Sequence, residues 1–122
     1  MKPTESELEI LTVLWREGSA SVGKVHEEIS KMKNVGYTTT LKLMQIMHEK
    51  KMVSRDETAK KHIYTPTVSQ EETQSYLLHK MIHNLFGGSS AGLILQALGN
   101  HKTSLEELNE IEKRINDLKK LG

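Results

Sequence analysis

The segment from Asn34 to Pro66, NVGYTTTLKLMQIMHEKKMVSRDETAKKHIYTP, decides the fold because its hydrophobic period changes along its length. In its first part apolar residues recur every three positions, as on one face of an α-helix. In its second part residues 53–58 and 62–65 read as two extended segments joined by a short turn. We therefore expect a helix followed by a two-stranded β-hairpin. The apolar stripe of that helix consists of Leu41, Met44 and Met47, broadened by Leu43 and Met52.

A first helix is expected near the start of the chain. Thr4 and Glu7 have the spacing of a capping box, in which each side chain accepts a hydrogen bond from the backbone amide of the other residue. Apolar residues then recur at helical spacing until Gly18. These signals predict a helix over about residues 5–17.

A second helix is expected between the first helix and the deciding segment. Ser21 is its candidate N-cap, and the turn Asn34-Val35-Gly36 ends it. Thr38 is expected to cap the third helix in the same way. The apolar residues of the second helix are Val22, Val25, Ile29 and Met32.

Three short helices followed by a hairpin form the layout of a winged helix-turn-helix, a domain that binds DNA. Its third helix, the recognition helix, fits the major groove, and its hairpin, the wing, follows the backbone. Threonines and backbone amides at the start of the third helix can contact phosphates or base edges. The expected DNA-binding residues are Lys33, Tyr37, Thr38, Thr39, Lys42, Gln45, Arg55, Lys60 and Lys61.

The distribution of charge agrees with a polyanionic partner. The chain has a formal net charge of +1, but residues 33–61 contain seven basic and three acidic residues. Residues 68–122 contain six basic and seven acidic residues. A cationic segment beside a nearly neutral one indicates double-stranded DNA as the partner of the first part.

The C-terminal part is expected to be helical and to form a homodimer. Ser69 and Glu72 again have capping-box spacing, a glycine pair at 87–88 breaks the apolar helix that follows, and Ser104 starts a last helix with a nearly heptad stripe. These helices could pack on their own chain, but they carry more apolar surface than a small winged domain can cover. The expected dimerisation residues are Leu77, Met81, Leu85, Leu105, Leu108, Ile111, Ile115 and Leu118.

The predicted fold is therefore mostly α. A winged helix-turn-helix DNA-binding domain, with three helices and a two-stranded β wing, spans residues 1–67. A helical dimerisation region spans residues 68–122. No sequence feature indicates a signal peptide or a transmembrane helix, so a cytoplasmic protein is expected.

Several functional classes are disfavoured by composition. The chain has no cysteine, which excludes disulfides and thiolate metal sites. His79 and His83 are four residues apart, but no third ligand stands at a suitable position beside them, so neither a metal nor a cofactor is expected. No nucleophile with a base and no phosphate-binding glycine loop is evident, so an enzyme is not expected.

The residues named so far also carry a family resemblance. The chain resembles the penicillinase repressor family, to which copper-responsive repressors are related, and the resemblance runs through most of its length. The matching features are Thr4-x-x-Glu7-Leu8-x-Ile10-Leu11-x-x-Leu14-Trp15, Gly18 with Ser21-Val22, Tyr37-Thr38-Thr39-Thr40-Leu41-Lys42-Leu43-Met44, Lys50-Lys51-Met52-Val53-x-Arg55-Asp56, His62-x-Tyr64-x-Pro66 and Phe86-Gly87-Gly88.

The resemblance implies a homodimeric repressor on an operator with dyad symmetry. In the β-lactam-responsive members a membrane sensor-protease cuts an Asn-Phe pair beyond the two glycines, where this chain has Gln96-Ala97. A sensor-protease partner is thus conceivable, but it would not cut the same dipeptide. The copper-responsive relatives carry a C-terminal cysteine cluster that this chain lacks. Ile46 stands where relatives often have a basic residue, so operator preference does not transfer.

One alternative function has the same fold. A winged helix can serve as a protein-interaction module without specific DNA binding. The positive balance of residues 33–61 and the outward threonines favour the DNA-binding repressor.

Overall fold

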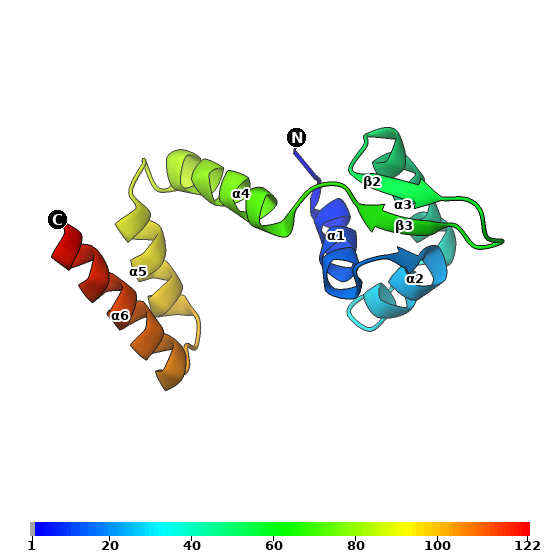
Figure 1. Cartoon of the computed structure of the whole chain (residues 1–122). Coiled ribbons are helices and arrows are strands. Elements are labelled where there is room, and N and C mark those ends of the chain that lie inside the picture. Colours follow the sequence, from blue (N-terminus) through cyan, green and yellow to red (C-terminus); the bar gives the residue numbers. More distant parts are fainter. Residues whose placement is uncertain (1) are drawn as a thin grey trace. The chain divides into compact units, whose positions relative to one another are not determined.

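The computed structural model describes residues 2–122 and divides into two compact units, one ending at Tyr76 and the other spanning Leu77–Gly122. The elements that lie wholly in the first unit are α1 (Glu5–Glu17), β1 (Ala20–Ser21), α2 (Val22–Ser30), α3 (Tyr37–Glu49), β2 (Val53–Asp56) and β3 (Ile63–Pro66) (Figure 1). The remaining elements are α4 (Gln70–Leu85), which begins in the first unit, α5 (Ser90–Asn100) and α6 (Leu105–Leu121). The predicted winged helix-turn-helix is confirmed.

The ends of α1 form as the sequence predicts. The amide of Glu7 donates to the hydroxyl of Thr4 at 3.2 Å, and the amide of Thr4 donates to the carboxylate of Glu7 at 2.8 Å. Gly18 ends the helix with φ of 85°, in the region that glycine adopts without steric cost. Ser21 caps α2 by accepting from the amide of Lys24 at 3.2 Å, as expected.

Two expectations about helix ends are wrong. α3 starts at Tyr37 with Gly36 as N-cap and no side-chain cap, so Thr38 is not the capping residue. The extended conformation that an N-cap needs is reached at Gly36, which places the Thr38 hydroxyl inside the first turn. Met32 does not belong to the apolar stripe of α2, because the helix ends at Ser30 and leaves Met32 64% exposed.

The hairpin is part of a three-stranded antiparallel sheet with strand order β1-β3-β2. Within the wing Arg55 pairs with Tyr64, and on the other side of β3 Ala20 pairs with the same tyrosine. The sequence analysis missed β1, because two residues carry no alternation and their partner lies some forty residues later in the chain. This pairing holds the start of α2 against the wing.

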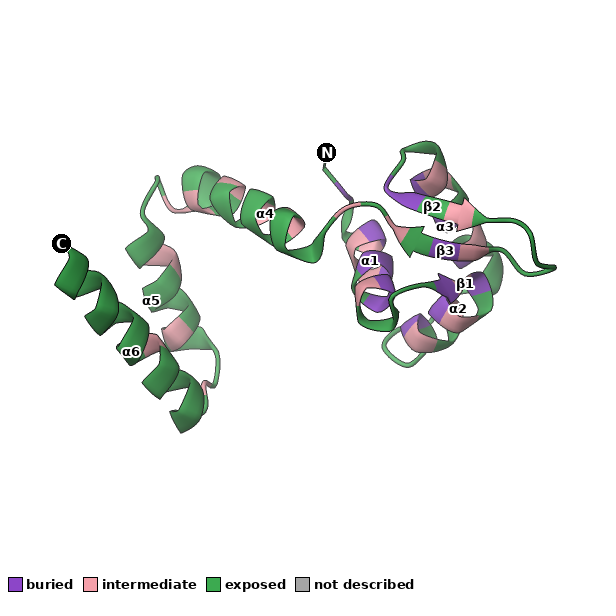
Figure 2. Cartoon of the chain, viewed as in Figure 1, coloured by how far each residue is buried: buried purple, intermediate pink, exposed green. Residues whose placement is uncertain are grey.

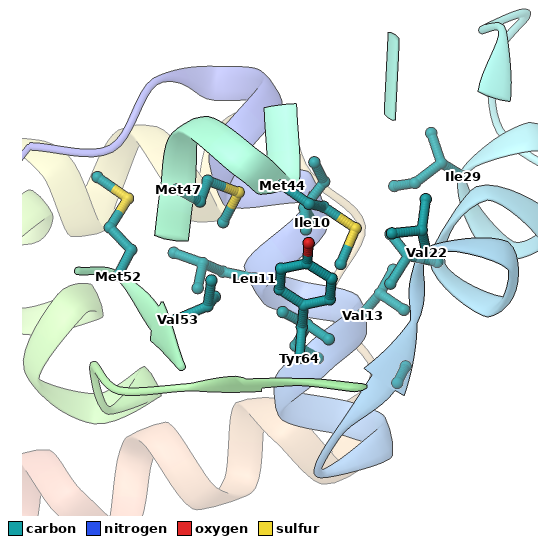
Figure 3. Packing of buried hydrophobic residues seen from close by; sticks show 13 residues of the cluster. Ile10, Leu11, Val13, Val22, Ile29, Met44, Met47, Met52, Val53 and Tyr64 are labelled. Atoms are coloured by element: carbon teal, nitrogen blue, oxygen red, sulfur yellow. The ribbon is translucent and has the colours of Figure 1, made fainter. Parts of the chain in front are cut away.

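The core lies in the first unit. Figure 3 shows side chains from the three helices and both wing strands pointing into one interior, with the ring of Tyr64 among them. Trp15 is partly buried against this cluster and donates from its indole nitrogen to the carbonyl of Val68 at 2.9 Å. That bond connects the chain after the wing to α1. The division between a DNA-binding domain and a dimerisation region after residue 67 stays a prediction. The buried apolar residues are Ile10, Leu11, Val13, Leu14, Ala20, Val22, Val25, Ile29, Met44, Met47, Met52, Val53 and Tyr64.

The second unit has a different character. Among the described residues after Tyr64 none is buried (Figure 2), although α4, α5 and α6 carry many large apolar side chains. The apolar residues 93–98 form the body of α5, and Gln96 and Ala97 lie within it. Burial of apolar surface is the main favourable term in folding, so these helices lack the burial that would stabilise them as they stand in one chain.

Candidate nucleic-acid interface

One face of α3 is exposed and polar. Met44 and Met47 point into the core together with the hydroxyl-bearing Thr40, which is 2% exposed. The opposite face carries four of the predicted residues, Thr38, Thr39, Lys42 and Gln45, and all four are exposed. Ile46, where relatives often have a basic residue, is half-buried. The helix therefore presents its first turns and one polar stripe to a partner.

A groove of about 560 Å³ lies between the start of α2, α3 and the wing. It brings together five predicted residues that are up to 24 positions apart in the sequence, from Tyr37 to Lys61. The side of the groove formed by the wing is basic. The residues that line the groove are Ser21, Val22, Gly23, Tyr37, Leu41, Gln45, Arg55, Lys60, Lys61, His62 and Tyr64.

Arg55 is the most constrained cation of the groove. Its side chain is 20% exposed, and its guanidinium lies 6.0 Å from the ring centroid of Tyr64. One Nη donates to the Tyr64 hydroxyl at 3.5 Å, and the other pairs with the Glu57 carboxylate at 3.0 Å. The hydrogen bond to Tyr64 and the charge of Glu57 raise the pKa of Arg55 above its ordinary value. Arg55 is thus a fixed positive charge at the base of the wing.

The other predicted cations lie in two different settings. Lys60 and Lys61 are exposed in the loop between β2 and β3, where long side chains reach a partner easily. Lys33 lies beyond α2 and pairs with Glu9 of α1 at 2.6 Å, beside a separate small hollow that Thr39 also lines. The structure therefore brings Tyr37, Gln45 and the wing cations to one groove and places Lys33 outside it.

The sequence analysis missed the contribution of α2. Ser21, Val22 and Gly23 line the groove, so the first turn of α2 forms part of its wall. Neither α2 nor α3 has an acidic residue in its first turn, whereas α1, α4 and α6 each have two. Helix N-termini without acidic residues are favourable places for a phosphate. Ser21 was predicted as a cap, but its place beside the wing depends on the pairing of β1 with β3.

Lys50, also part of the basic segment, has a structural role. Its ammonium group lies 2.9 Å from the carboxylate of Glu7, which is 1% exposed as a whole residue. Burial raises the pKa of Glu7, but the hydrogen bonds from Thr4 and the charge and hydrogen bond of Lys50 outweigh it, so the pKa lies below its ordinary value of 4.5. This pair joins the end of α3 to the start of α1.

A pH prediction follows for Glu7. Because the folded state lowers the pKa of this carboxyl, its contribution to stability is complete above its unfolded value and is lost as the pH falls through the folded value. Glu7→Gln should lower the free energy of unfolding by about 1–2 kcal/mol at neutral pH. Below pH 4.5 the free energy of unfolding of this variant should fall less with decreasing pH than that of the wild type. Urea titrations between neutral and acid pH measure this. Glu5→Gln, an exposed change on the same helix, is the control, and equal acid profiles for Glu7→Gln and the wild type would contradict the assignment.

The described residues show no group of three or more histidines, cysteines or acidic residues able to hold a metal ion. His79 and His83 are both exposed on α4. Across residues 2–122 no helix reaches the length and apolar character needed to cross a membrane.

The comparisons with known proteins agree with this geometry. The family model described as Penicillinase repressor matches residues 3–117 of the chain. The chain is 22% identical over 115 residues to a penicillinase repressor of Staphylococcus aureus, covering 94% of this chain and 91% of the relative. It is also 22% identical over 116 residues to a penicillinase repressor of Bacillus licheniformis, covering 95% and 91%. Members of this family are transcriptional regulators, not enzymes. The exposed polar face of α3 and the basic side of the wing agree with this match over nearly the whole length, and the match shows the family: the chain belongs to the penicillinase repressor family.

Proposed function

We propose that the protein is a transcriptional repressor that binds, as a homodimer, a double-stranded operator with dyad symmetry. The observation that carries this proposal is the groove in which the exposed face of α3, the start of α2 and the wing cations converge. A recognition helix in the major groove with a basic wing on the flanking backbone would use all three at once. A repressor acts at the chromosome. This role agrees with the cytoplasmic location expected from the sequence.

Each predicted residue has a distinct role in this proposal. Lys42 and Gln45 reach base edges, because they are exposed one and two turns into α3. Thr38, Thr39 and Tyr37 contact phosphates near the start of the helix. Arg55, Lys60, Lys61 and Lys33 neutralise phosphates and set the dependence of affinity on salt.

The dimer is supported by the exposed apolar side chains of the second unit. Of the eight predicted dimerisation residues, Leu77 and Ile111 are half-buried and the other six are exposed. Exposures of 41–73% for Leu105, Leu108, Ile115 and Leu118 leave one stripe of α6 uncovered within the chain. A second copy presents the same stripe and can cover it by two-fold symmetry, which also matches the symmetry of the proposed operator.

Substitution of the basic residues tests the DNA contacts. Lys60→Ala with Lys61→Ala should reduce the slope of log K against log salt by about 4 for the homodimer, because each lysine neutralises about one phosphate and both subunits lose the pair. Lys42→Ala should instead weaken binding to an operator sequence, obtained by selection from a random DNA pool, by about tenfold. It should change binding to random duplex DNA less. Fluorescence anisotropy titrations at several salt concentrations measure both effects.

Matched controls come from the last helix. Lys119→Ala and Lys120→Ala remove the same two charges from the C-terminal turn of α6, where the proposal places no DNA. They should leave the salt slope unchanged. An unchanged slope for the wing variants as well would overturn the docking of the wing. A protein that binds no duplex at any salt concentration would favour the protein-interaction alternative.

A further inference from the structure

Glu57 occupies one guanidinium edge of Arg55. The Glu57 carboxylate lies 3.0 Å from one Nη of Arg55 and 4.0 Å from Nε2 of His62. Both partners line the groove between α2, α3 and the wing. An acidic side chain thus lies at the most basic part of the surface proposed to receive DNA.

The wing turn does not depend on Glu57. The turn is held by Asp56, whose carboxylate accepts from the amide of Thr58 at 2.9 Å and from its hydroxyl at 2.7 Å. These bonds lower the pKa of Asp56. The side chain of Glu57 is 56% exposed, and its polar neighbours among the described residues are Arg55 and His62, which both line the groove. Its position is therefore not explained by the stability of the hairpin.

Arg55 offers an external anion only one edge of its guanidinium. Its Nε is buried and donates to no group in the described part of the chain, although guanidinium groups bind carboxylates and phosphates through two parallel hydrogen bonds. The Glu57 carboxylate takes only one such bond. Since the Nε is closed to solvent and one Nη already donates to Tyr64, a phosphate would reach Arg55 at the Nη that Glu57 holds, so the two anions compete for the same donor.

We propose that Glu57 is an internal counter-ion of Arg55 that a DNA phosphate displaces, so that Glu57 sets the affinity of the repressor by competing with DNA. This inference rests on the proposed function. The Glu57 side of this ion pair is 56% exposed, so solvent weakens the pair and a phosphate can replace the carboxylate. Breaking the pair lowers the free energy gained from the Arg55–phosphate contact. Glu57 thereby keeps the affinity for non-specific DNA low, where backbone contacts dominate.

The test uses the full-length protein and a labelled duplex of random sequence. Glu57→Gln should tighten binding about three- to fivefold at low salt, which is the size expected for loss of an exposed ion pair. Glu49→Gln removes the same charge from the exposed end of α3 and is the matched control. Its effect should be clearly smaller. Equal gains for the two variants would show a general charge effect and overturn the proposal.

A double-mutant cycle separates competition for Arg55 from simple repulsion of phosphate. In an Arg55→Gln background, Glu57→Gln should change affinity by less than a factor of about 1.5, because the competed cation is gone. A gain that persists in this background would overturn the proposal. The Glu49 comparison keeps Arg55, so where Arg55→Gln fails to fold it still overturns the proposal if the gain at position 57 is no larger than the gain at position 49. Binding by the wild type with no gain in Glu57→Gln refutes only this inference, whereas no binding by the wild type refutes the proposed function.

Discussion

Ending the chain before Ser104, which removes α6, is expected to weaken operator binding about a hundredfold or more. Two linked half-site contacts gain on the order of 10²–10⁴ in affinity over one contact, and the proposal assigns the link to the tail. The exposed stripe of α6, with Leu118 at 50% and Leu121 at 85%, is the largest uncovered apolar feature of that helix. Loss of the dimer and loss of operator affinity should therefore occur together.

Sedimentation velocity measures the loss of the dimer, and mobility shifts on the same preparations measure the loss of operator affinity. The matched control is Glu112→Gln in the full-length chain, an exposed polar position on the same helix. It should remain dimeric and bind normally. A truncated protein that still sediments as a dimer would remove α6 from the role proposed for it.

Leu11→Ala should produce a large loss of stability in the first unit. Leu11 is 0% exposed and belongs to the cluster formed by the three helices and the wing. Truncation of a fully buried leucine costs about 2–5 kcal/mol through lost burial and the cavity left behind. Since whole domains are stable by only about 5–15 kcal/mol, the variant should lose a large part of its stability.

Denaturant titration followed by tryptophan fluorescence measures this loss, because Trp15 lies one turn from Leu11 on α1. Met32→Ala, a truncation of a residue that is 64% exposed, is the control and should change the free energy of unfolding by less than about 0.5 kcal/mol. A loss below 1 kcal/mol for Leu11→Ala would contradict the packing seen in Figure 3.

Local signals in the sequence predict the helices well. The capping box of Thr4 and Glu7, the stop at Gly18 and the stripe of Met44 and Met47 all act within a few residues, so the sequence alone reveals them. Thr38 shows the limit of such signals. Three threonines follow Tyr37, and composition does not indicate that the chain already reaches cap geometry at Gly36.

The candidate site was less predictable, since it depends on contacts between distant segments. The pairing of Ser21 with Ile63 brings the start of α2 to the wing, and no local pattern encodes it. The ion pairs that hold Lys33 and Lys50 join residues 24 and 43 positions apart. Sequence reasoning therefore identified the basic segment but not which of its cations are engaged by carboxylates of the same chain.

Selection of bound sequences from a random DNA pool, with the stoichiometry of the selected complex measured by mobility shift, tests the central claim most directly. A repressor that reads two half-sites by symmetry should enrich a palindromic consensus bound by two subunits together, with its half-sites about one helical turn apart. No enrichment by a well-folded dimer would contradict the claim and leave the winged helix as a surface for protein partners.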